Sequence, residues 1–128
     1  MKFDADLSNL DKGIWRVYDD VEFRLTHISN IRFQRSLAKH QQPYRRKLTE
    51  GTLDPKISQE ILCKAMGEAI IIDWRGKMAD SQGNQIPYTS ENASYLLNRD
   101  PDFRDWVAAE ASNMAAFRIE EVRALGEG

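Results

Sequence analysis

The chain has 128 residues, of which 41% are hydrophobic and 30% are charged, and its net charge is −2. This length supports one ordinary domain with its own core, and the composition is that of a soluble globular protein. The nearly balanced charge argues against a general attraction to nucleic acid or to an anionic membrane surface. The single Cys63 excludes an internal disulfide and a cysteine-based zinc site, as expected in a reducing compartment.

The ends of the chain suggest neither secretion nor a membrane anchor. The N-terminal residues are polar, and the longest apolar run, residues 69–72, is too short to span a bilayer. Residues 1–12 lack periodicity, so we expect a flexible arm there. A single domain over residues 13–125 and a short tail at residues 126–128 complete the predicted organisation.

A β-hairpin is predicted at residues 14–27, with its turn at Asp19 and Asp20. A two-residue turn pairs Tyr18 with Val21, and paired residues share a face of the hairpin. This register places the apolar side chains on one face, interrupted only by Arg16: Ile14, Tyr18, Val21, Phe23 and Leu25. Trp15 pairs with Arg24 on the opposite face. Because an isolated hairpin is marginally stable, it must pack on helices or pair with another subunit.

The next predicted helix is capped by Ser29 or Asn30 and runs to about Gln42, before Pro43. Its inward-facing residues are predicted to be Ile31, Phe33 and Leu37. Another turn or two follows over residues 44–48.

A second helix begins at an Asp54 cap and is predicted to continue through the isoleucine run to Gly76. The three consecutive isoleucines make its end apolar on all sides, which predicts burial at the centre of the domain. Gly67 within this helix predicts close contact with a neighbouring backbone.

Two further helices are predicted after a turn-rich loop at residues 77–85. Thr89 caps a helix that ends near Asn98, and Asp100 caps a last helix that carries Asn113 and Phe117. The fold class is therefore α+β and mostly α, with an N-terminal β-hairpin followed by about four helices.

Several short elements occur in a distinctive order: the strand Gly13–Tyr18 with its partner Val21-Glu22-Phe23, the pair Asp73-Trp74, the turn Ile86-Pro87-Tyr88, and a helix with Asp105-Trp106, Asn113 and Phe117. Together these elements resemble the tail assembly chaperones of long-tailed bacteriophages. The resemblance covers roughly residues 13–122. The chain departs from the family at Ser90, where a proline often opens the short helix.

The resemblance implies a protein made in the host bacterial cytoplasm and absent from the mature virion. Such a protein binds the tape-measure protein and tail-tube subunits, and keeps them soluble until the tube polymerises. Family members are made in a short form and in a longer, frameshifted form, which becomes a further expected partner. The ending Leu125-Gly126-Glu127-Gly128 resembles that of a short form.

Six aromatic residues can either line a binding groove or fill the core: Trp15, Trp74, Tyr88, Phe103, Trp106 and Phe117. We favour the core for Phe103, Trp106 and Phe117. Trp15 can contact a partner or stack on an arginine. The candidate partner-binding residues are Trp15, Arg24, Trp74, Tyr88, Arg45 and Arg46.

The two halves of the chain differ in charge. Residues 24–47 contain seven cations and no acid, whereas residues 100–128 contain seven acids and three cations. A solvated helix face is the preferred interpretation of the basic segment, and charge-steered assembly into a homo-oligomer is the second. Contact with nucleic acid is the third and least favoured interpretation.

No residue pattern indicates catalysis, a metal site or a cofactor. His27 and His40 have no acidic residues at ligand spacing, and Cys63 lies in the most apolar helix, as a core thiol would. Ser90 lacks a nearby histidine and the glycines of a nucleophile turn. We therefore expect a protein that is not an enzyme. Two alternatives to the chaperone are a small nucleic-acid-binding regulator using residues 32–47 and a structural head–tail connector protein.

Overall fold

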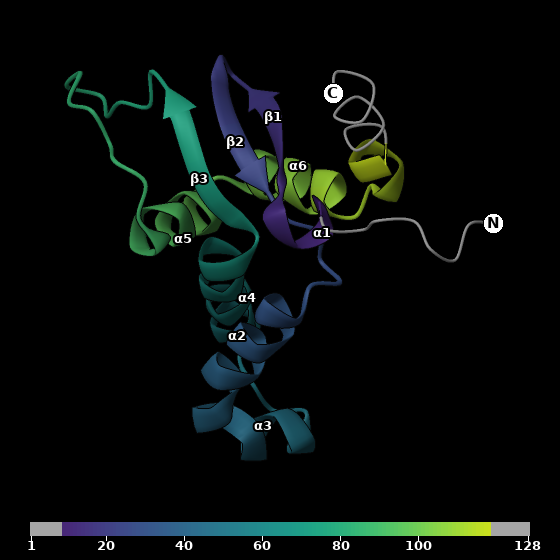
Figure 1. The fold of residues 1–128 in the computed structure, drawn as a ribbon. Coiled ribbons are helices and arrows are strands. Elements are labelled where there is room, and N and C mark those ends of the chain that lie inside the picture. Colours follow the sequence, from purple (N-terminus) through teal and green to yellow (C-terminus); the bar gives the residue numbers. More distant parts are fainter. Residues whose placement is uncertain (1–8, 119–128) are drawn as a thin grey trace.

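The structure is a computed structural model that describes residues 9–118 (Figure 1). The chain is α+β and mostly helical, as predicted. In chain order the elements are α1 (Asn9–Lys12), β1 (Ile14–Tyr18), β2 (Val21–Leu25), α2 (Ile31–Gln41), η1 (Gln42–Tyr44), α3 (Arg45–Glu50), α4 (Pro55–Ala69), β3 (Ile71–Gly76), α5 (Ser90–Arg99) and α6 (Pro101–Ala111).

The predicted hairpin register is confirmed. Tyr18 pairs with Val21 and Ile14 pairs with Leu25, and the three residue pairs between them follow the same register. Asp19 and Asp20 both have positive φ angles, 50° and 64°. This is the geometry of a type I′ turn, whose twist matches that of the flanking strands.

The predicted helix to Gly76 is wrong in its last third, because α4 ends at Ala69 and residues 71–76 form strand β3. β3 pairs antiparallel with β2, so the sheet order is β1-β2-β3. The β-branched isoleucines explain the change, since their stiff side chains favour extended backbone on a pleated, buried surface. The hairpin therefore gains its third strand from its own chain.

The core lies between the inner face of the sheet and helices α4, α5 and α6. Phe23 is 2% exposed, and its ring centroid is 5.0 Å from that of Phe103 and 6.0 Å from those of Trp74 and Trp106. The predicted backbone contact at Gly67 is confirmed. A Cβ added there would lie 2.8 Å from the Ser94 nitrogen, so glycine lets α4 and α5 approach closely.

Helix boundaries agree with the predicted caps except near the C-terminus. The side chains of Asn30, Asp54, Thr89 and Asp100 each accept a hydrogen bond from the first turn of their helix. The last helix does not run through to Phe117. It ends at Ala111, and helical structure resumes at residue 114 with the Asn113 Oδ1 atom 3.4 Å from the Ala116 nitrogen.

Two further expectations are corrected. Ile31 does not face inward and is 58% exposed, because the side of α2 that packs on the body carries Phe33, Ser36 and Leu37. The expected flexible arm of residues 1–12 is helical over Asn9–Lys12, where the Leu10 carbonyl accepts a hydrogen bond from the His27 nitrogen. Residues 1–8 and the predicted tail at 126–128 lie outside the described residues.

Residues 31–51, which comprise α2, η1, α3 and Gly51, form a helical arm that projects from the rest of the molecule (Figure 1). α2 packs along α4, but no residue of α3 is buried. Gly51 ends α3 with φ +69°, a left-handed conformation that glycine adopts without strain. The chain can therefore turn sharply at the far end of the arm and return to α4.

Candidate interaction surfaces

The six predicted partner-binding residues lie in three separate places. Trp15 and Arg24 are on the face of the sheet that points away from the core, as the paired register requires. Trp74 and Tyr88 lie beneath the loop that follows β3, and Arg45 and Arg46 lie on α3. The structure therefore does not gather them into one site.

The outer sheet face consists of Trp15, Val17, Glu22, Arg24, Asp73 and Arg75. The Arg75 guanidinium carbon lies 4.0 Å from the Trp15 ring centroid, and its Nη2 atom lies 2.6 Å from Glu22 Oε2. Trp15 thus stacks on an arginine, as one of the two interpretations held. The arginine is Arg75 on β3, whereas Arg24 donates from Nε to the Lys12 carbonyl at 2.7 Å.

Trp74 and Tyr88 hold the loop of residues 77–88 against β3. The Trp74 indole donates to the Ile86 carbonyl at 3.0 Å, and the Tyr88 hydroxyl donates to the Ile71 carbonyl at 2.6 Å. Their ring centroids lie 5.2 Å apart in an edge-on arrangement. Burial, and then the nearby Asp73 and Glu91, raise the pKa of Tyr88, so its hydroxyl keeps its proton and this bond.

Of the aromatic residues expected in the core, Phe103 and Phe117 are buried and Trp106 is partly buried. Trp74, at 7% exposure, joins the cluster of Phe103 and Trp106, whereas Phe117 packs in a second cluster with Ile14 and Ala116. These rings mainly fill the interior, and Phe103 also lines a cleft beside Tyr18.

The helical arm displays six cations, all of them exposed: Arg32, Arg35, Lys39, Arg45, Arg46 and Lys47. Its acidic residue, Glu50, lies 3.4 Å from Arg46. The arm is held to the body by a polar cluster in which the Ser36 hydroxyl and the His40 Nε2 atom contact the two Glu68 carboxylate oxygens. Burial raises the pKa of Glu68, but hydrogen bonds from Ser36 and His40 outweigh it and lower that pKa overall.

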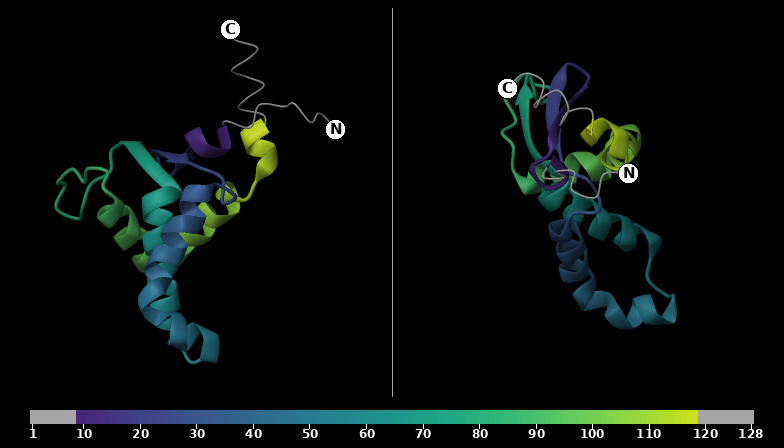
Figure 2. Two further views of the ribbon diagram at one scale, coloured as in Figure 1. Left: turned by 60° about the horizontal axis from the view of Figure 1, so that its bottom comes forward. Right: turned by 45° about the vertical axis from the view of Figure 1, so that its right-hand side comes forward.

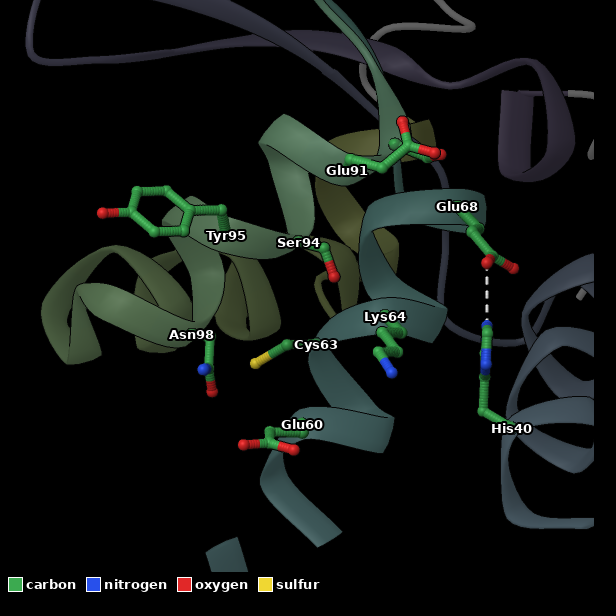
Figure 3. A pocket seen from close by; sticks show the side chains of 10 residues that line it. His40, Glu60, Cys63, Lys64, Glu68, Glu91, Ser94, Tyr95 and Asn98 are labelled. Carbon is green, nitrogen blue, oxygen red and sulfur yellow. Dashed lines mark hydrogen bonds and ion pairs between the residues drawn. The ribbon is translucent and has the colours of Figure 1, made fainter. Parts of the chain in front are cut away.

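The Glu68 cluster borders a cleft of about 470 Å³ between α2, α4 and α5 (Figure 3). Cys63 lines this cleft, but burial raises the pKa of its thiol, which therefore stays protonated and weakly nucleophilic. Sequence reasoning missed Glu68, because 28 residues separate it from His40 and no local pattern links them. Within residues 9–118, no group of three or more His, Cys, Asp or Glu is placed to hold a metal ion.

A comparison with protein-family models shows where the chain comes from. The model described as YdaY prophage protein matches residues 28–127. The chain belongs to this family. It is therefore a phage-derived protein, which confirms the phage origin that the resemblance implied.

The match to the YdaY family begins after the hairpin, so it includes the helical arm, β3 and the helices that cover the sheet. No curated protein and no solved structure matches the chain. Among the described residues, no helix is long and apolar enough to cross a membrane.

Proposed function

We propose that this YdaY-family chain is a tail assembly chaperone, which binds the tape-measure protein and tail-tube subunits and keeps them soluble during tail assembly. Two sequence findings support the proposal. The chain belongs to a prophage family, and residues 13–122 resemble tail assembly chaperones in the order of their elements. The structural observation that carries the proposal is the outer sheet face.

The outer sheet face has two apolar residues on its edge strand β1, beside charged residues on β2 and β3. Val17 is 63% exposed and lies two residues along β1 from the partly exposed Trp15, with Glu22, Arg24 and Arg75 on the neighbouring strands. Helices α4, α5 and α6 pack on the opposite face of the sheet, and within residues 9–118 Val17, Asp73 and Arg75 on this face are exposed. A tryptophan near an exposed aliphatic residue, with charged groups alongside, is a composition found in protein-binding surfaces.

Binding to such a face is reversible, because it consists of apolar contact and hydrogen bonds without a covalent step. Fully burying one aliphatic side chain contributes roughly 1.5–3 kcal/mol, so a few contacts give moderate affinity. The growing tail tube then competes for the same client surfaces, and the chaperone is released as the tube polymerises.

The experiment is co-expression with the tape-measure protein of the same prophage, followed by measurement of soluble and co-purified client. Val17→Lys places a charge beside Trp15 on the apolar edge strand of the outer sheet face and should greatly reduce both quantities. The matched control is Tyr95→Lys on α5, because Tyr95 has a similar exposure, 59% against 63% for Val17. The control should behave as the wild type.

Two results would count against the proposal. If the tape-measure protein stays insoluble beside the wild-type chain, the chaperone activity is absent. If the chain is found in purified phage particles, it is a structural component such as a head–tail connector, since a chaperone leaves before the virion is complete.

A further inference from the structure

We propose that the arm tip of one copy of the chain, residues 45–48, docks into the Tyr18 cleft of a second copy. The Tyr18 cleft has a volume of about 230 Å³ and lies between the hairpin turn, the start of the loop after β3 and the start of α6. Its lining includes Tyr18, Asp19, Met78, Leu96, Asp100 and Phe103. The contact needs no client, so it is independent of the chaperone proposal.

The Tyr18 cleft combines an apolar wall with an acidic rim. Tyr18 and Phe103 meet edge to face with centroids 5.3 Å apart, and Met78 and Leu96 extend this wall. Asp19 and Asp100 line the cleft, with Lys77 as its one lining cation. Burial, and then the charges of Asp100, Asp102 and Asp19, raise the pKa of Tyr18, so Asp102 adds to the negative charge near this ring although it does not line the cleft.

The arm tip has the complementary chemistry. Arg45, Arg46 and Lys47 occupy consecutive positions, and Leu48 beside them is 39% exposed. The Arg46 side chain is 93% exposed and its contact with Glu50 is long, at 3.4 Å, so its charge stays available to a partner. A leucine flanked by cations matches an apolar cleft flanked by carboxylates, and its side chain is small enough for the cleft volume.

The arm tip cannot occupy the cleft of its own copy. Figure 1 shows α3 at the end of the molecule farthest from the hairpin turn, and both views in Figure 2 show the arm extending away from the sheet. The occupant is therefore a second copy. Because the contact joins two different surfaces, it closes into a ring or a reciprocal dimer where the geometry permits and otherwise forms an open chain.

The test is the sedimentation velocity of the purified chain across protein concentration, between about 50 mM and about 500 mM salt. Wild type should self-associate at low salt and dissociate as salt screens the charges. Arg45→Glu should weaken self-association by about tenfold or more, because it faces the acidic rim with a like charge. Lys12→Glu makes the same charge change on α1, away from the arm tip and from the Tyr18 cleft, and should associate as wild type.

Charge exchange makes the test specific to this pair of surfaces. Asp102→Lys reverses a charge that acts on Tyr18 from beside the cleft, and should weaken self-association as Arg45→Glu does. Asp102 is exposed and is not the cap of α6, so this change keeps the fold, which circular dichroism would verify. Mixing the two variants should restore association, because each mixed contact again pairs opposite charges.

A wild-type chain that stays monomeric at every concentration and salt would overturn the proposal. Failure of the mixed variants to associate would overturn it as well. If the wild type is monomeric and instead binds a DNA or RNA duplex, with binding abolished by Arg45→Glu, the occupant of the arm tip is a polyanion and not a second copy.

Discussion

The body of the molecule, formed by the three strands with α4, α5 and α6, differs sharply from the helical arm. The body contains the buried aromatic cluster around Phe23, whereas the arm buries only Phe33 and Ser36 on α2 and nothing on α3. Hydrophobic burial stabilises the body, and a polar cluster at Glu68 helps to hold the arm. The body therefore determines the stability of the fold, and the arm presents charge at a distance from it.

The largest expected effect is a difference in the free energy of unfolding between a substitution in the body and one in the arm. Phe23→Ala removes a ring that contacts three other aromatic residues, and should lower the free energy of unfolding by about 3–5 kcal/mol. Ile31→Ala on the arm should change it by less than about 0.5 kcal/mol, because that side chain is mostly exposed. Urea titration measures both, and equal losses would contradict the division.

Gly67→Ala tests the close packing within the body. Alanine in a helix is normally more stable than glycine by about 1 kcal/mol. Here the added methyl group meets the α5 backbone at 2.8 Å and 2.9 Å, so we expect a net loss of about 1–3 kcal/mol. A higher melting temperature for the alanine variant would show that α5 moves away at little cost.

Acidification should act on the body before it acts on the arm. Burial lowers the pKa of His27 from its ordinary 6.5, so the unfolded chain binds a proton more readily and body stability falls as the pH drops below about that value. The pKa of Glu68 is also lowered, from 4.5, so its contribution is complete above that value and is lost as the pH falls further. Hydrogen exchange of α2 and of the strands across pH would resolve the two steps. His27→Gln should remove the first step and Glu68→Gln the second.

The smallest expected effect concerns the outer sheet face. Arg75→Lys keeps the charge but loses the flat contact with Trp15 and the paired bonds to Glu22. Because the site is exposed, the loss of stability should be within about 1 kcal/mol. Tryptophan fluorescence should nevertheless shift, and an unchanged spectrum would mean that the stacked arrangement is rarely populated.

Local patterns predicted much of this fold. The alternation in residues 14–25 and the two aspartates fixed the hairpin register, and short polar side chains marked four helix starts. Strand β3 was missed because an apolar run of isoleucines suits a buried helix or a buried strand equally well, and only its pairing with β2 separates them.

The surfaces were harder to predict than the elements. Arg75 on β3 reaches across β2 and stacks on Trp15 of β1. This contact could not be predicted while residues 71–76 were expected to be helical. Glu68 meets Ser36 and His40 from a distant part of the sequence, and the Tyr18 cleft combines residues of two strands, two helices and two loops. Each of these sites arises from tertiary packing, so spacing along the chain carries no signal for it.

The most direct test of the central claim, that this chain acts by binding a phage tail protein on its outer sheet face, is site-specific photo-crosslinking in cells that co-express the tape-measure protein. A photoreactive residue replaces Val17 in one variant and Tyr95 in the other, two positions of similar exposure on different faces. We predict a strong adduct with the tape-measure protein from position 17 and little from position 95. No adduct from position 17, or equal adducts from both positions, would contradict the account.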